Sequence, residues 1–400
     1  MGAALARRVA EYLREHQQAL VEFLKRLALA ESPSTEPEAQ EEVLGIIFKA
    51  LAELGFEVRR IRGPRSSGHL YARPATRERH APVQLLLGHC DTIWPLGTLE
   101  EMPVEVRDGV VRGPGVYDMK GGLAQIVFAL RALRDLDLKP SVTPVVFVNS
   151  DEEVGSKEST RHIRRLSCIA DRAFVLEPSL GPSGKLKTTR KGVGRFSVIV
   201  KGEAAHAGLN PEEGVSAILE LSHLIQALFA LNDPARGTTV NVGTIDGGLS
   251  PNVVAPESRA LVDVRVPTTE DARRVEAAIL GLKPITPGVT LRVEGGMGRP
   301  PMERTPRNRR LWETAHRLGK ELGLDLGEAM AGGASDGNTT SLFTATLDGL
   351  GAVGDGPHAR HEFVYVDKMV ERCALLTLLL MEPPLFEEGG SRRPSTSLRP

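Results

Sequence analysis

The apolar residues in the first 190 positions follow two different periods. Residues 4–30 and 36–54 repeat apolar side chains at helical spacing, as in Leu20, Leu24 and Leu27. Short continuous apolar runs come next, which are typical of strands buried on both faces of a sheet. The predicted strands are 56–62, 69–73, 83–87, 142–148 and 172–176, and a helix is predicted over 121–133. Strands that alternate with helices indicate an α/β fold with a mostly parallel sheet sandwiched by helices.

The pattern changes near Arg190, where apolar and polar residues begin to alternate singly. A period of two is typical of strands with one face in water. Strands are predicted at 196–200, 239–245, 259–266 and 289–293, and helices at 213–231 and 269–280. We interpret this segment as an α+β open-faced sandwich inserted into the chain.

Pro300-Pro301 marks the return to the first pattern, with apolar segments near 342–353 and helices predicted at 306–322 and 366–381. The tail is rich in Gly, Ser, Pro and Arg, a composition typical of disorder. The predicted domains are an α/β domain in two parts, 1–190 and 301–385, an inserted domain at 191–300, and a disordered tail at 386–400.

Composition narrows the classes of partner. Fifty basic and 51 acidic residues give a formal net charge of −1, which argues against nucleic acid or a membrane surface held by bulk electrostatics. The N-terminal segment lacks the apolar core of a signal peptide, and no run approaches the roughly 20 apolar residues of a membrane span. Three widely spaced cysteines (Cys90, Cys168 and Cys373) predict no disulfide framework. We expect a cytoplasmic protein.

Candidate chemistry begins where the strand predicted at 83–87 stops. His89 and Asp91 lie beyond its carboxyl end, where open α/β sheets bind their ligands. An imidazole can bind a metal ion while a carboxylate accepts the proton on its other ring nitrogen. On their own, however, two such residues are more often part of an ordinary loop.

Four further segments offer residues of the same type. They contribute Asp118; Asp151, Glu152 and Glu153; Glu177; and the pair His358 and His361. Asp118 follows a glycine-rich turn, where the alternative is an ordinary helix N-cap. Three adjacent carboxylates repel one another unless a cation or exposure to water relieves them, so a solvated loop is the alternative for the second segment.

Together, these imidazoles and carboxylates at strand ends suit a divalent ion, above all Zn²⁺, and are too rich in carboxylates for a structural cysteine-type site. Several carboxylates shared among few imidazoles further indicate two ions with one bridging residue. Two ions can hold a water and polarise a carbonyl, as hydrolysis of an amide requires. A neighbouring Glu would take the proton of that water and pass it to the leaving nitrogen.

Three motifs carry a resemblance to a known family. They are His89-Cys90-Asp91-Thr92, Asp118-Met119-Lys120-Gly121-Gly122, and Asp151-Glu152-Glu153-Val154-Gly155-Ser156. In this order they resemble the dinuclear-zinc aminoacylase and carboxypeptidase family (metallopeptidase family twenty), and most closely its glutamate carboxypeptidase branch. Other members are acetylornithine deacetylase and succinyl-diaminopimelate desuccinylase. The resemblance implies a zinc-exopeptidase-like catalytic domain interrupted by a lid and dimerisation domain.

Carried over position by position, the resemblance implies a role for each residue. The metal ligands would be His89, Asp118, Glu153, Glu177 and His358, with Asp118 bridging two Zn²⁺ ions that Co²⁺ or Mn²⁺ could replace. Asp91 would orient His89, and Glu152 would be the general base. His361 competes with His358, which is preferred because it keeps the family's four-residue offset from Glu362.

The inserted domain carries further candidates. His206, in Gly202-Glu203-Ala204-Ala205-His206-Ala207-Gly208, resembles a family histidine that crosses a dimer interface and donates to the substrate carbonyl oxygen; an exposed loop histidine is the alternative. Asn252 resembles a second polar lid contact. Arg265 and Arg299 match positions that hold a substrate carboxylate, and Gly333 and Ser335 resemble part of the pocket wall. Arg190 and Lys191 could act similarly, but a solvated strand edge explains them equally well.

The sequence therefore predicts a zinc-dependent metallohydrolase of the carboxypeptidase type. It would release a C-terminal, glutamate-like amino acid from a small peptide or an N-acyl amino acid, as a homodimer joined through the inserted domain. The nearest alternative is an N-acyl-amino-acid deacylase. A less favoured one is a non-catalytic binding protein that retains the fold.

Overall fold

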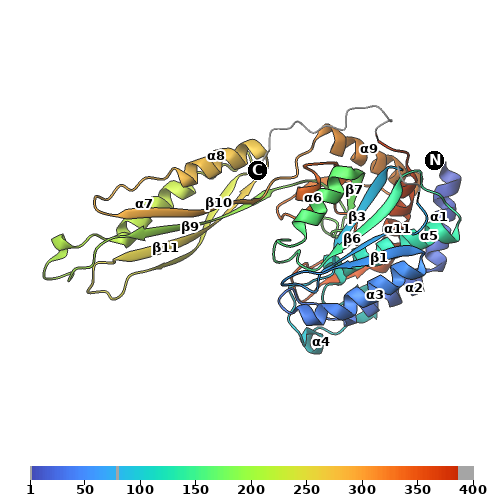
Figure 1. Ribbon diagram of the computed structural model, residues 1–400, viewed down its shortest axis with the longest axis horizontal. Coiled ribbons are helices and arrows are strands. Elements are labelled where there is room, and N and C mark those ends of the chain that lie inside the picture. The colour runs from blue at the N-terminus through green and yellow to red at the C-terminus, as the bar shows by residue number, and fades with distance from the viewer. Residues whose placement is uncertain (1, 78–80, 386–400) are drawn as a thin grey trace. The chain divides into compact units, whose positions relative to one another are not determined.

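A computed structural model describes residues 2–77 and 81–385, and Figure 1 shows the path of the chain. The chain forms two compact units. Of the described residues, the first unit contains those up to Thr188, Arg304–Ala329 and those from Ser335 to Leu385, and the second contains Thr189–Glu303 and Met330–Ala334. The long segment of the second unit, Thr189–Glu303, overlaps the predicted insertion, 191–300, whereas its short segment, Met330–Ala334, lies in the part predicted to return to the first domain. The tail predicted to be disordered, 386–400, lies outside the described residues.

The first unit is built around a six-stranded sheet. Its strands are β1 (Phe56–Ile61), β2 (His69–Pro74), β3 (Val83–His89), β6 (Thr143–Asn149), β7 (Ala170–Val175) and β14 (Ala345–Leu347). Their order across the sheet is β1-β2-β6-β3-β7-β14. The pairs β6-β3, β3-β7 and β7-β14 are parallel, whereas β1-β2 and β2-β6 are antiparallel. The prediction of a mostly parallel sheet is confirmed.

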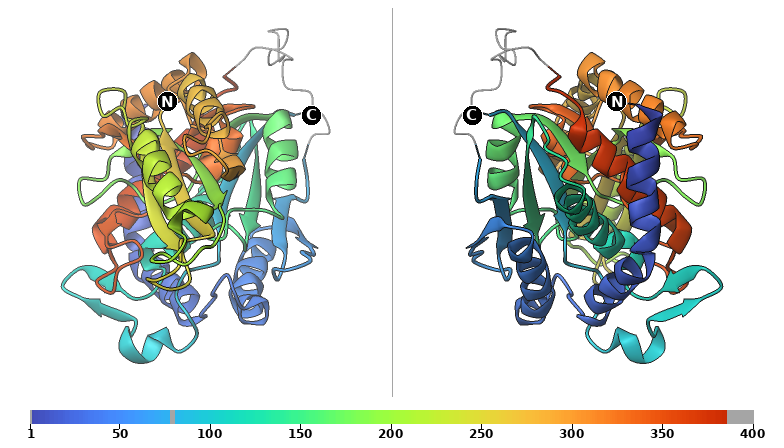
Figure 2. Two further views of the ribbon diagram at one scale, coloured as in Figure 1. Left: turned by 90° about the vertical axis from the view of Figure 1, so that its left-hand side faces the viewer. Right: turned by 90° about the vertical axis from the view of Figure 1, so that its right-hand side faces the viewer.

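Helices cover both faces of this sheet. One face packs in a single core against α1 (Ala3–Glu15), α2 (Gln17–Leu29), α3 (Gln40–Glu53), α5 (Gly121–Asp135), α9 (Pro306–Glu321) and α11 (Val366–Met381). In the right-hand view of Figure 2, α1 (blue) and α11 (red) lie side by side. On the other face, Leu85, Phe147 and Val175 pack against Ile163 of α6 (Thr160–Ile169). Apolar side chains therefore leave the strands in both directions, which explains their continuous apolar sequence.

The helix predicted over 4–30 is wrong in one respect, because the structure has two helices, α1 and α2, that meet at His16. The apolar stripe continues across His16, so periodicity alone cannot reveal the break. The imidazole Nδ1 of His16 lies 2.8 Å from the carbonyl oxygen of Tyr12 and competes for an acceptor of the helix backbone.

Several short elements were not predicted from the sequence. The most important is a small sheet in the order β15-β16-β5-β4, whose strands are only two or three residues long. Their bounds are β4 (Glu105–Arg107), β5 (Val110–Arg112), β15 (Gly354–Asp355) and β16 (Phe363–Tyr365). The others are α4 (Thr98–Glu101), α6, α10 (Asp336–Thr340) and the paired strands β8 (Leu186–Arg190) and β13 (Glu328–Ala331). Except for α6, which spans ten residues, these runs are too short to show a period.

The second unit is an antiparallel sheet with helices on one face. Its strands are β9 (Gly192–Lys201), β10 (Thr239–Gly247), β11 (Glu257–Val266) and β12 (Thr290–Arg299), in the order β10-β11-β9-β12. The helices α7 (Ala217–Phe229) and α8 (Thr269–Leu280) share one core with the sheet. Along β11, Ala260 and Val262 are buried in that core, whereas Arg259 and Leu261 are exposed. The predicted open-faced sandwich is confirmed.

Two predictions from composition can also be compared with the structure. Cys90 and Cys373 are buried, Cys168 is exposed, and all three are free thiols. Among the described residues, no helix has both the length and the apolar character that crossing a bilayer requires.

Gly122, the last residue of the motif Asp118-Met119-Lys120-Gly121-Gly122, lets the start of α5 approach the carboxyl end of β7. A Cβ atom at this position would lie 2.0 Å from the carbonyl oxygen of Leu176, the residue before Glu177. Only glycine allows this approach, so the motif serves the packing of the site as well as its chemistry.

We predict that Gly122→Ala lowers the free energy of unfolding by about 1–3 kcal/mol, because the added methyl group must displace backbone. Gly45→Ala is the matched control: Gly45 lies within α3, and a Cβ there meets no atom within 4 Å. This control should be stabilised by about 0.5–1 kcal/mol. Urea unfolding measures both changes, and a Gly122→Ala protein as stable as the wild type would contradict the packing described.

Candidate metal centre

The candidate ligands gather at the carboxyl ends of three neighbouring parallel strands. β3 lies between β6 and β7, and its last residue, His89, is in register with Asn149, the last residue of β6. The segment 151–153 follows β6, and Glu177 follows β7. Because parallel strands end at the same side of a sheet, groups from separate motifs are brought together there.

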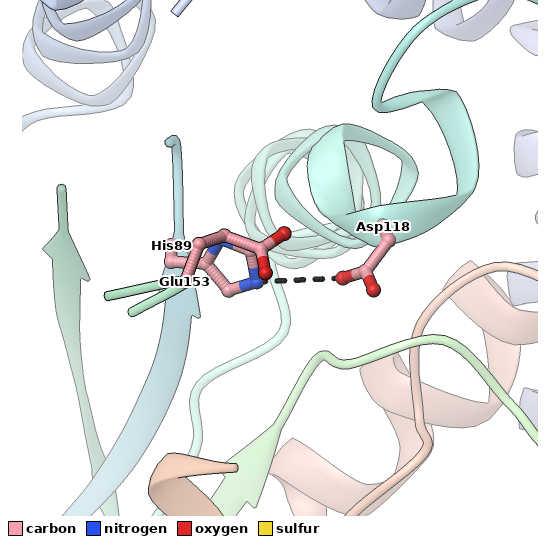
Figure 3. A group of neighbouring side chains, drawn as sticks. All are labelled: His89, Asp118 and Glu153. Carbon is pink, nitrogen blue, oxygen red and sulfur yellow. Dashed lines mark ion pairs between the residues drawn. The ribbon is translucent and has the colours of Figure 1, made fainter. Parts of the chain in front are cut away.

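His89 is 2% exposed and lies between two carboxylates. Its Nε2 atom is 3.4 Å from Asp118 Oδ1 and 3.3 Å from Glu177 Oε1. Asp118 belongs to the irregular turn Val116–Lys120 that precedes α5. Figure 3 shows Asp118 facing the ring of His89, with Glu153 beside them. The first imidazole therefore has one carboxylate from a turn and one from a strand end.

His358 makes a second, similar set in the turn between β15 and β16. Its Nε2 atom lies 3.2 Å from Glu153 Oε2 and 3.6 Å from Asp118 Oδ2. The two oxygens of Asp118 thus face different histidines. His361 is exposed, and within the described residues no ion pair joins it to an acidic group. The geometry favours His358 over His361.

The chemistry of this cluster fits divalent cations. One ligand atom each from His89, Asp118 and Glu153 lies within 4.8 Å of the others. The buried oxygens Asp118 Oδ1 and Glu153 Oε1 have no hydrogen-bond partner, although buried polar atoms rarely lack one. A cation would supply the missing interaction for both, and nitrogen and oxygen ligands in this ratio suit Zn²⁺.

The pKa values of these groups reflect how closely the carboxylates and imidazoles are packed. Burial lowers the pKa of His89, but Asp118, Asp91 and Glu177 raise it well above its usual value. The hydrogen bond with Glu153 raises the pKa of His358 to about 9. Burial raises the pKa of Glu153, and the charge of Asp118 adds to the rise. The nearby carboxylates thus favour the protonated form of both imidazoles, and a cation would compensate the same negative charge.

Asp91 is a fully buried carboxylate that joins the parts of the site. Its Oδ1 atom lies 3.4 Å from His89 Nδ1 and accepts the backbone N–H of Glu152 at 3.2 Å. Its Oδ2 atom accepts the backbone N–H of Glu153 at 3.1 Å and the hydroxyl of Ser34 at 2.7 Å. Asp91 therefore holds the backbone of the proposed base and of a proposed ligand, besides facing His89.

Ser34 was missed as a functional residue. The segment 32–34 served in the sequence only to separate two helices, but it pairs with the residues after β3. Thr92 donates its N–H to the Ser32 carbonyl at 2.8 Å, and Ser34 donates its N–H to the Thr92 carbonyl at 3.0 Å. No local pattern signals this contact, because it joins positions 58 residues apart.

Glu362 was also missed as a candidate, because in the sequence it only defined the four-residue spacing that favours His358 over His361. Its carboxylate is 1% exposed and accepts hydrogen bonds from the turn that carries Asp118. Burial raises the pKa of Glu362 to about 7, although the backbone donors oppose the rise.

His206 and Asn252 lie on adjoining segments of the second unit. Ala207 donates its N–H to the Asn252 carbonyl at 3.0 Å, and Val254 donates to the Ala205 carbonyl at 2.9 Å. His206 is exposed, and its Nδ1 atom accepts the N–H of Gly208 at 3.1 Å, which leaves Nε2 directed away from this contact. The pairing brings together two residues that the sequence placed 46 positions apart.

The remaining predicted substrate contacts have varied surroundings. Arg265 donates two hydrogen bonds to Asp263, at 2.7 and 3.0 Å. Arg299 is the last residue of β12. The carbonyl of Gly333 accepts a hydrogen bond from Arg190 at 3.1 Å. Ser335 is fully buried at the start of α10 and donates to Asp348 at 2.7 Å. Their roles toward substrate stay predictions.

Comparison with known proteins adds to this geometry. Residues 188–282 match the model of the M20 peptidase dimerisation domain. Carboxypeptidase G2 from Pseudomonas sp. (strain RS-16) is 28% identical, over 92% of this chain and 90% of its own. Succinyl-diaminopimelate desuccinylase from Bradyrhizobium sp. (strain ORS 278) is 30% identical, over 59% of this chain and 66% of its own. In fold, the chain resembles an M20-family metallo-carboxypeptidase, Sso-CP2 from Sulfolobus solfataricus, with a TM-score of 0.69, 16% identity, and coverage of 92% and 98%.

We predict that His358→Ala lowers the amount of metal that the purified protein retains, because it removes the imidazole facing both Glu153 and Asp118. His361→Ala, the matched control three residues away, should retain metal as the wild type does. Elemental analysis of both variants measures the difference. If His361→Ala is the variant that sheds metal, the choice of His358 is wrong.

Proposed function

The chain belongs to the M20 family of metallohydrolases, and we propose that it is a carboxypeptidase that releases a C-terminal amino acid from a small peptide or an N-acyl amino acid. The similarity to carboxypeptidase G2 extends over nine-tenths of both chains and supports this choice. The observation that carries the proposal is the position of Asp118, whose two oxygens face two different histidines. That arrangement suits a carboxylate shared by two metal ions.

The five proposed ligands divide into two sets that share Asp118. One ion would be held by His89, Asp118 and Glu177, and the other by His358, Asp118 and Glu153. Zn²⁺ is the proposed ion, and Co²⁺ or Mn²⁺ suit the same ligands. Ions bound here would lower the pKa of a water and polarise the substrate carbonyl.

Glu152 is the proposed general base. It lies directly before the proposed ligand Glu153, and its backbone is fixed by the hydrogen bond to Asp91. Its carboxylate would accept the proton of the attacking water and deliver it to the leaving nitrogen of the amide. Asp91 would keep Nδ1 of His89 protonated, so that Nε2 is the atom directed at the metal.

We further propose a homodimer joined through the second unit, which the match to a dimerisation domain supports. The surface of this unit supports it too, because Leu209, Ile245 and Leu249 are 73%, 59% and 76% exposed. A dimer interface over these side chains would remove their apolar surface from water. In the dimer, His206 would donate to the substrate carbonyl oxygen in the active site of the other subunit.

The alternative function is an N-acyl-amino-acid deacylase, which the similarity to the desuccinylase favours. Both reactions hydrolyse an amide, so the metal centre does not distinguish them. Both kinds of substrate also carry a free carboxylate, so a hydrolysis screen across dipeptides and N-acyl amino acids is what separates the two functions. Arg265 donates two hydrogen bonds to Asp263. We propose Arg265 and Arg299 for the substrate carboxylate, because both match family positions that hold one.

We predict that Glu152→Gln keeps the metals and the fold but loses about 10²–10⁴-fold in kcat, because an amide cannot accept the proton of the water. Metal content, thermal unfolding and kcat of the variant, measured together, test the assignment. Near-normal turnover at full metal occupancy would remove Glu152 from the mechanism.

We also predict that Arg299→Lys raises KM for substrates with a free C-terminal carboxylate, because lysine cannot form the two parallel hydrogen bonds of a guanidinium. Amide analogues of the same substrates should be poor for the wild type and change little in the variant. A purely structural Arg299 would instead give lower thermal stability and an equal loss for acid and amide substrates. That uniform loss would remove Arg299 from carboxylate recognition.

A further inference from the structure

Glu362 is a buried carboxylate that the proposed reaction uses neither as a ligand nor as a base. It lies directly before β16, in the small sheet that the sequence did not predict. A carboxylate that is 1% exposed is costly unless several donors stabilise it. The identity of its donors therefore indicates what the residue does.

The donors of Glu362 are concentrated on the turn that carries Asp118. The Oε1 atom accepts the backbone N–H groups of Tyr117 and Asp118 at 2.8 and 2.9 Å. The Oε2 atom accepts the N–H of Gly115 at 2.9 Å and the indole N–H of Trp94 at 3.0 Å. Three of the four donors are thus backbone groups within residues 115–118. Charge-assisted bonds of this kind fix a turn firmly.

Glu362 is also tied to the turn that carries His358. Its backbone N–H donates to the carbonyl of Ala359 at 3.0 Å, and this bond closes the turn just after His358. On its other side, β16 pairs with β5, and Gly113 donates its N–H to the Glu362 carbonyl at 3.4 Å. Glu362 therefore connects the segments of two residues, Asp118 and His358, that come from distant parts of the chain.

We propose that Glu362 is a positioning residue of the metal centre, which sets the distance between Asp118 and His358 by holding both turns. The proposal rests on the metal centre of the proposed function. Groups that orient metal ligands in this way typically contribute 10–100-fold to metal affinity. A residue that only stabilised the fold would change the stability of the metal-free protein without changing that affinity.

Glu362→Gln is the first test, because the amide nitrogen cannot accept the N–H groups that the carboxylate accepts. Zn²⁺ binding is measured on the full chain by competition with a chelator of known affinity. We expect an affinity about 10–100-fold below that of the wild type. Glu371→Gln is the matched control, since Glu371 lies on α11 and pairs with Lys368 at the surface. Its Zn²⁺ affinity should equal that of the wild type.

Trp94→Phe is the second test, because it removes one donor and leaves the carboxylate in place. We expect a smaller loss of Zn²⁺ affinity than in Glu362→Gln. A folded Glu362→Gln protein with wild-type affinity would overturn the proposal. If Glu362→Gln does not fold, wild-type affinity in Trp94→Phe would overturn it, and weakened affinity would support it. A wild type that binds Zn²⁺ but hydrolyses no amide would instead contradict the proposed function alone.

Discussion

The organisation of the site depends on the buried carboxylate of Asp91. It accepts three hydrogen bonds from two segments of the chain: one from the hydroxyl of Ser34 and two from the backbone of Glu152 and Glu153. It also faces the ring of His89 at the end of the central strand. A buried carboxylate that lost any of these partners would destabilise the fold, so the segments are held together. The proposed base and two proposed ligands are therefore positioned by one group.

Repulsion between carboxylates is the second constraint, and it opposes the hydrogen bonds that hold the site together. Asp118, Glu153 and Glu177 are crowded around two imidazoles at the ends of strands, where their mutual repulsion disfavours the folded chain. The raised pKa values of His89 and His358 are the response of the protein alone to that crowding. Divalent cations offset the same repulsion and leave the imidazoles neutral, as ligands must be. The fold holds the carboxylates close together, and the metal proposal accounts for why it does so.

Much of this arrangement could be predicted from the sequence because its signals are local. Strands with continuous apolar runs and helices with a stripe predicted the α/β sheet. Polar residues after the strands and in turns supplied candidate ligands, and the family resemblance implied the role of each. The break at His16 could not be predicted, since the apolar stripe of the helix continues across it. The small sheet of β4, β5, β15 and β16 could not be predicted either, since its strands are too short to show a period. Ser34 and Glu362 were missed because they act through contacts between distant segments, which only the folded chain reveals.

Asp118 is the residue on which the dinuclear proposal depends, because its two oxygens face different histidines. Calorimetric titration of the metal-free protein with Zn²⁺ tests that proposal most directly. We expect two equivalents of Zn²⁺ per chain for the wild type, and tight binding of neither ion by Asp118→Ala, because the shared ligand is missing from both sets. A wild type that binds one equivalent or none, or an Asp118→Ala protein that still binds two tightly, would contradict a shared metal centre.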